Sequence, residues 1–227
     1  MTIADRVEDV RARIADAAAR AGRDASEVTL VAVTKTVDVE RMREAVAAGI
    51  ADLGENRAQE LEAKIRDVSG ARWHFIGTLQ RNKVRAIAGR VALIHSVDSV
   101  PLADAIARAA GSAQDVLIEV NTSGERSKHG VHPDVVDELV DAVARDPRLD
   151  LKGFMTIAQA GDERAVRASF TRLREVRDRV AADHPAARDL SMGMSGDFEL
   201  AVEEGATIVR VGTAIFGERP RLGRHRR

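Results

Sequence analysis

The sequence predicts one (β/α)8 barrel, the TIM-barrel fold, preceded by an extra helix. Three observations lead to this prediction. Short apolar runs recur along almost the whole chain, helical patterns separate them, and no linker or low-complexity segment divides the 227 residues. Regular alternation of strand and helix is typical of a parallel sheet. Eight such units in a chain of this length match a closed barrel of eight parallel strands inside a ring of helices.

The first element is an amphipathic helix over residues 3–21. Apolar residues recur at steps of three or four positions from Val7 to Ala18, which is the period of one helix face. Gly22 follows, and glycine commonly ends a helix. Because this helix stands before the first strand, we expect it to lie outside the eight repeating units.

Eight apolar runs follow, each short enough to be a buried strand. They lie at 28–33, 50–54, 73–77, 91–97, 115–121, 149–157, 189–195 and 207–217. Of the helical stretches between them the clearest is 164–180, where one face is apolar and arginines and acids fill the other. A doubly wound open sheet is the alternative, but it would need a glycine-rich turn after the first strand, and "AVTKTVD" has no glycine.

Composition limits the classes of function. Lysine and arginine total 35 against 36 acidic residues, so no net field draws the protein to nucleic acid or to an anionic membrane. Cysteine is absent, and His129 and His132 share one loop without a third ligand, so no metal site is expected. No apolar run approaches the roughly 18 residues of a membrane span, and the N-terminus is unlike a signal peptide. We expect a cytoplasmic monomer with one domain over 1–219 and a disordered basic tail over 220–227.

Functional residues of such barrels lie where strands end at their carboxyl side. Lys35 follows the first strand and, by alternation, shares the inward face with Val31 and Val33. Two interpretations remain open. The lysine is simply solvated, or it is desolvated in the barrel mouth near Arg210 and therefore nucleophilic enough to form an imine.

Small residues follow the last two strands. Ser195 and Gly196 stand in "MSGD", and Gly212 and Thr213 stand in "VGTA". Barrels of this class commonly bind a phosphate at these positions, on backbone N–H groups near a helix start. Ser-Gly-Asp is also an ordinary turn and helix cap, so the motif alone leaves both interpretations open. Four further candidates stand in or shortly after predicted strands: Asn56, His74, Met155 and Arg210.

Six ordered motifs carry a resemblance to a known family. They are "AVTKT" (32–36), "GENRAQE" (54–60), "WHFIGTLQRNK" (73–83), "GFMTI" (153–157), "SMGMSGD" (191–197) and "VRVGTAIFG" (209–217). With them the chain resembles the pyridoxal phosphate homeostasis proteins, the YggS or PROSC-type family, over residues 28–219. These are single-domain relatives of the alanine racemase barrel, fold type III among pyridoxal-phosphate proteins. Phe154, where leucine is usual, and His129 before Gly130 are mild departures.

The resemblance implies a site and a function. Lys35 would carry pyridoxal 5′-phosphate as a Schiff base. Phosphate contacts would come from Ser195, Gly196, Gly212 and Thr213, and ring contacts from Arg210, Asn56, His74 and Met155. The implied role is to bind the cofactor and to supply it to apo-enzymes as transient partners, without turnover. Other B6 vitamers are further candidate ligands.

The residue beside the pyridine nitrogen bears on catalysis. An arginine stays charged and can only donate a hydrogen bond, so the ring withdraws electrons less well than one protonated by a carboxylate. Racemases with this barrel use a tyrosine from another domain as their second base, and this sequence contains no tyrosine. Two alternatives stay open: a pyridoxal-phosphate-dependent amino-acid racemase, and an imine-forming aldolase that acts on a phosphorylated sugar.

Overall fold

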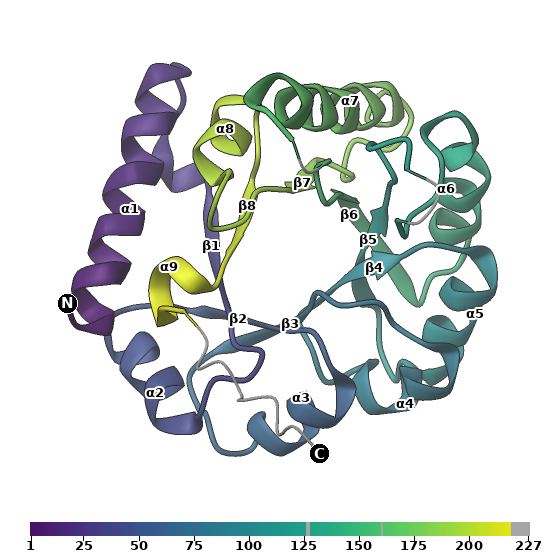
Figure 1. The fold of residues 1–227 in the computed structure, drawn as a ribbon. Coiled ribbons are helices and arrows are strands. Elements are labelled where there is room, and N and C mark those ends of the chain that lie inside the picture. The colour runs from purple at the N-terminus through teal and green to yellow at the C-terminus, as the bar shows by residue number, and fades with distance from the viewer. Residues whose placement is uncertain (126–127, 160, 219–227) are drawn as a thin grey trace, which may run out of the picture.

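The structure, a computed structural model, describes residues 1–125, 128–159 and 161–218, and its strands form a closed barrel (Figure 1). All eight are parallel and follow one another around the barrel in chain order. They are β1 Thr29–Val33, β2 Asp52–Glu55, β3 Arg72–Phe75, β4 Leu93–Val97, β5 Gln114–Glu119, β6 Leu149–Met155, β7 Asp189–Ser191 and β8 Ile208–Val211. Pairing of β1 with β8, with Leu30 opposite Val209, closes the ring. The predicted barrel is confirmed.

Helices surround the barrel on its outside (Figure 1). They are α1 Ile3–Arg20, α2 Val39–Ala47, α3 Ala58–Lys64, α4 Val84–Ile87, α5 Val100–Ala109, α6 Val136–Arg145, α7 Glu163–Val180, α8 Phe198–Glu203 and α9 Thr213–Phe216. Short 3₁₀ turns occupy Ala25–Glu27, Arg81–Lys83 and Pro133–Val135. Among the residues so described, no helix is long and apolar enough to cross a bilayer.

The extra helix α1 lies where the sequence predicts it and packs against α8 and α9, the last two helices of the ring. Its start is capped reciprocally: Thr2 Oγ1 accepts from the Asp5 N–H, and the Asp5 carboxylate accepts from the Thr2 N–H. On its polar side Arg13 donates two hydrogen bonds to Glu199 of α8, at 2.8 and 2.6 Å. The helix therefore covers the seam at which the first and last strands meet.

The barrel interior holds two kinds of side chain. One cluster is apolar and consists of Val31, Leu93, Leu117, Met155 and Ile208. A second set is polar and equally buried, and it comprises Asp52, His74, His95, Ser191 and Arg210. Interiors of such barrels are ordinarily filled by branched apolar residues. A set of five buried polar side chains is therefore unusual for the interior of such a barrel.

The last two predicted strands are too long. β7 ends at Ser191 rather than at 195, and β8 ends at Val211 rather than at 217, because "TAIF" forms helix α9. A short apolar run has the same appearance in a buried strand and in a buried helix, so periodicity alone does not separate them. Gly193 helps to end β7: it adopts φ +92°, and a Cβ there would lie 2.5 Å from Ala201 Cβ. The residues that follow β7 and β8, which are not part of the strands, border the site described below.

The predicted disordered tail, 220–227, lies outside the described residues, and the one-domain assignment stays a prediction.

Candidate functional site

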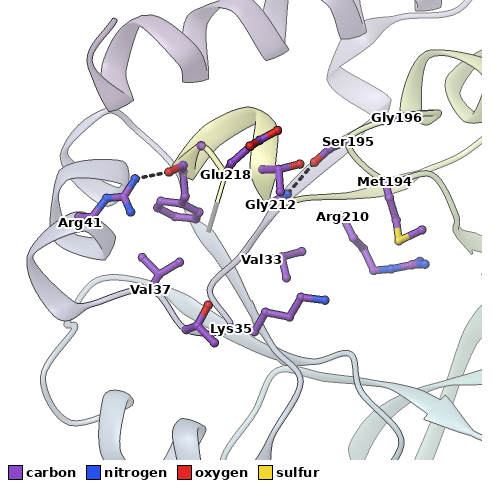
Figure 2. A pocket seen from close by; sticks show the side chains of 14 residues that line it. Val33, Lys35, Val37, Arg41, Met194, Ser195, Gly196, Arg210, Gly212 and Glu218 are labelled. Carbon is purple, nitrogen blue, oxygen red and sulfur yellow. Dashed lines mark hydrogen bonds between the residues drawn. The ribbon is translucent and has the colours of Figure 1, made fainter. Parts of the chain in front are cut away.

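A cavity of about 260 Å3 opens at the carboxyl end of the barrel, between β1 and the loops after β7 and β8. Its lining includes six of the predicted residues: Lys35, Ser195, Gly196, Arg210, Gly212 and Thr213. Figure 2 shows the Lys35 side chain extending into the space that Arg210 borders, with Ser195 and Gly212 across the cavity. Barrel closure is what brings these residues together, since β8 is the neighbour of β1.

Lys35 stands in a turn that begins two residues after β1 ends. The next residue, Thr36, has φ +63°, a left-handed conformation that is unusual for a threonine. Its N–H donates to Glu60 Oε2 at 3.0 Å, which fixes the turn on that side. Strained backbone of this kind costs of order 1–3 kcal/mol and persists only where surrounding contacts over-determine it. The position of the Lys35 backbone is therefore set by other residues.

Those contacts come from the "GENRAQELEAK" segment. The Lys64 ammonium donates to Thr34 O at 2.8 Å, to Glu55 Oε2 at 2.8 Å and to Glu60 Oε2 at 2.9 Å. Thr34 Oγ1 also donates to Glu55 Oε2, at 2.9 Å. Glu55 is fully buried and Lys64 is 12% exposed, so the pair is screened little by solvent. One cation and two carboxylates thus hold both flanks of Lys35.

The loops after β7 and β8 are tied to each other through one hydroxyl. Ser195 Oγ accepts from the N–H groups of Gly212, at 3.1 Å, and Ala214, at 3.3 Å. The N–H groups of Ser195 and Gly196 themselves donate to no atom of the described residues. A Cβ built on Gly196 would meet nothing within 4 Å, so the backbone there borders open space. Free backbone donors beside a helix start suit an anionic group such as a phosphate.

Arg210 is 4% exposed and lies in β8 with its guanidinium at the cavity. Its Nη1 donates to Ser191 Oγ at 2.7 Å and its Nη2 donates to Thr156 O at 2.9 Å. Burial lowers the pKa of Arg210 to about 10, and the nearby carboxylates Glu119 and Asp197 oppose that shift. The group therefore stays charged at neutral pH and can only donate hydrogen bonds.

The remaining predicted residues do not line this cavity. His74 lies inside the barrel, where Nε2 is 2.9 Å from Asp52 Oδ1 and Nδ1 is 2.9 Å from His95 Nε2. Met155 is 1% exposed and packs in the apolar interior cluster. Asn56 lines a second cavity instead. Position in or after a strand places a residue near the barrel mouth, but it does not say how deep the side chain lies.

The second cavity, of about 310 Å3, opens among the ends of β2, β3, β5 and β6, and it is lined by Asn56, Glu119, Lys128, His129 and Thr156 among others. Glu119 is 5% exposed. Burial raises its pKa to about 7, Asp98 adds to the shift, and His129 and Arg210 oppose it. Asn56 Oδ1 is also buried and has no hydrogen-bond partner in the part of the chain that the structure describes.

Among the residues of these cavities that sequence reasoning missed are Glu119 and Arg41. Glu119 stands inside a predicted strand, where nothing in the pattern separates it from a solvated acid. Arg41 lies in α2, lines the first cavity and donates to Phe216 O (Figure 2). An arginine on an outer helix carries no local signal, so only the contact of Arg41 with Phe216 of α9 reveals it.

The chain matches one protein-family model, described as "Alanine racemase, N-terminal domain", over residues 7–220. Among curated proteins it is 45% identical to the pyridoxal phosphate homeostasis protein of Aquifex aeolicus, over 96% of this chain and 99% of that protein. It is also 45% identical to the protein of the same name from Pseudomonas aeruginosa, over 96% of each chain. These relatives are therefore similar over their full length.

Solved structures show the same relationship as the sequence comparisons. PipY of Synechococcus elongatus, solved with PLP bound, superposes with a TM-score of 0.83 at 34% identity, covering 95% of this chain and all of that one. Alanine racemase from Corynebacterium glutamicum superposes with a TM-score of 0.70 at 19% identity, and the match covers 63% of its length. At that identity the second likeness concerns the fold alone.

Proposed function

The chain belongs to the pyridoxal phosphate homeostasis protein family, and we propose that it holds pyridoxal 5′-phosphate as a Schiff base on Lys35. In this proposal the protein limits the free aldehyde and hands the cofactor to apo-enzymes. The observation that carries it is the single cavity in which Lys35 faces the Ser195–Gly212 loops across a space bordered by Arg210.

The donor set fits the cofactor group by group. The N–H groups of Ser195 and Gly196, with the Thr213 hydroxyl, suit the phosphate. Arg210 offers the donor for the pyridine nitrogen, and it is charged there at neutral pH. When bound, the cofactor supplies an aldehyde that amines attack and a ring that withdraws electrons.

The charge on Arg210 supports storage without turnover. Because a charged guanidinium does not accept a proton, it does not keep the pyridine nitrogen protonated, and the ring withdraws electrons only weakly. The sequence has no tyrosine to act as a second base. If the alternative, an amino-acid racemase, were correct, the holo-protein would catalyse exchange of the α-hydrogen of an amino acid in heavy water faster than free cofactor does.

We expect the protein to purify yellow and Lys35→Ala to lose the absorption band of the imine. Borohydride reduction of the wild type, followed by peptide mass mapping, is expected to place the cofactor on Lys35. Lys152→Ala is the matched control, because Lys152 pairs with Asp150 and Asp115 on β6 and β5 outside both cavities. A wild type that stays colourless after addition of the cofactor, or an adduct on another lysine, would contradict the proposal.

A further inference from the structure

Five buried polar side chains from five strands form one hydrogen-bonded line through the barrel interior. From Arg210, Nη1 lies 2.7 Å from Ser191 Oγ, which lies 2.9 Å from His95 Nδ1. His95 Nε2 is 2.9 Å from His74 Nδ1, and His74 Nε2 is 2.9 Å from Asp52 Oδ1. Each of the five is at most 5% exposed. We call this line the interior relay.

The relay connects the functional cavity with the opposite end of the barrel. Arg210 borders the cavity, whereas Asp52 begins β2 and accepts two hydrogen bonds from Arg72, at 2.8 and 2.7 Å. The Arg72 side chain is 66% exposed, so the line ends at solvent. Burial alone would raise the pKa of Asp52, but the hydrogen bonds from His74 and Arg72 outweigh it and hold the pKa below its usual value. Asp52 is therefore an anion and Arg210 a cation.

These end charges determine the direction of the hydrogen bonds. An arginine can only donate and an ionised carboxylate can only accept. His95 is neutral because burial, with the nearby His74 and Arg210, lowers its pKa well below the usual value. An assignment that satisfies every link has Arg210 donating to Ser191, Ser191 to His95, His95 to His74 and His74 to Asp52. Both histidines then carry their proton on Nε2.

Burying a row of polar side chains inside a barrel lowers the stability of the fold unless every group is hydrogen-bonded. Each buried polar group costs free energy unless all its partners are in place, and a well-packed apolar replacement is often as stable. The relay contacts one functional group, the Arg210 guanidinium. Ser191 and Thr156 O restrain two of its donors, which leaves the rest of the planar fork to face the cavity.

We propose that the interior relay is a positioning device for Arg210, in which His74, His95 and Ser191 set where the guanidinium donates in the cofactor cavity. The inference rests on the proposed function, because it takes Arg210 to be the group beside the cofactor ring. His95 is the central positioning residue: it is fully buried and lies outside the cavity lining. Its effect on the cofactor must therefore travel through Ser191 and Arg210.

The first measurement needs no cofactor. Nitrogen-15 NMR of the imidazoles in the apo-protein is expected to show a proton on Nε2 of both His74 and His95, and none on His95 Nδ1. In Ser191→Ala the His95 Nδ1 signal is expected to shift, because its donor is gone. A proton on His95 Nδ1, or a charged His95, would overturn the relay as assigned, whether or not the protein binds the cofactor.

The second measurement tests whether the interior relay affects the absorption band and the affinity of the bound cofactor. His95→Phe is expected to shift the absorption band of the bound cofactor and to weaken its binding about tenfold, equivalent to about 1.4 kcal/mol. His95→Gln is expected to recover most of the wild-type band and affinity, because an amide also offers one donor and one acceptor side. If His95→Phe does not fold, Ser191→Ala tests the same role, because it removes the hydroxyl that joins His95 to Arg210 and is expected to shift the band.

Ser96→Ala is the matched control. Ser96 is the next residue of β4, is 1% exposed and donates to Gly77 O at 2.6 Å, so its loss disturbs the same strand without touching the relay. We expect this variant to be less stable but to keep the wild-type band and affinity. Wild-type band and affinity in His95→Phe, or equal spectral shifts in Ser96→Ala, would overturn the positioning role. A wild type that binds no cofactor would instead remove the proposed function and leave the NMR result standing.

Discussion

Lys64→Met is expected to lower the free energy of unfolding by about 3 kcal/mol, because removing one member of a buried ion pair leaves the other charge uncompensated. Glu55 is fully buried and would keep only neutral donors, the Thr34 hydroxyl and the Asn56 N–H. The turn that carries Lys35 would also lose its contact at Thr34 O. Urea unfolding of the apo-protein measures the stability. The same variant is expected to bind the cofactor more weakly, since Lys35 would no longer be held in place.

A matched control is a second ion pair that involves helix α3. Glu62 of α3 pairs with Arg90 at 3.3 Å, and both side chains are nearly half exposed, at 46% and 48%. Arg90→Met also removes a cation from an ion pair with α3, yet exposed pairs typically contribute less than about 1 kcal/mol. We expect its stability and cofactor affinity to stay close to those of the wild type. Equal effects of the two substitutions would show that the Lys64 network does not hold the Lys35 turn.

Glu119→Gln is expected to stabilise the apo-protein at pH 8 by up to about 3 kcal/mol, and to change its stability little near pH 4.5. Burial raises the pKa of Glu119 from 4.5 to about 7, so the folded protein favours the protonated acid. Between these two values the unfolded chain releases a proton that the folded chain retains. The contribution of Glu119 to the stability of the wild type therefore falls as pH rises through this window, and the glutamine variant does not show that loss.

Urea unfolding at pH 4.5, 6 and 8 measures this effect. Glu125→Gln is the control, because that carboxylate lies nearby, beside Lys128, but is 41% exposed. We expect the difference in stability between Glu119→Gln and the wild type to grow with pH, and at pH 8 to exceed the difference between Glu125→Gln and the wild type. A difference for Glu119→Gln that does not depend on pH would contradict the raised pKa. A buried acid kept at this cost is a candidate for a role in the second cavity.

Several parts of the fold and the site were predictable from local pattern. The α1 helix and the eight strands follow from the spacing of apolar residues, and the strand-to-helix alternation leads to a barrel. Given a barrel, Lys35 and the 195–196 and 212–213 loops had to meet, because the first and last strands are neighbours. The end of β8 was not predictable, since "TAIF" is apolar whether it forms a strand or a helix.

The sequence by itself determined the architecture and the end of the barrel at which Lys35 faces the loops after β7 and β8, because both depend on spacing along the chain. Tertiary structure alone decided which polar residues act together. His95 and Ser191 stand 96 positions apart, and Lys64 reaches Thr34 from 30 positions away. Whether a histidine or a lysine is buried, and whether it has a hydrogen-bond partner, depends on residues that distant strands bring beside it. Desolvation and hydrogen bonding set charge and position, and both exist only once the barrel has closed.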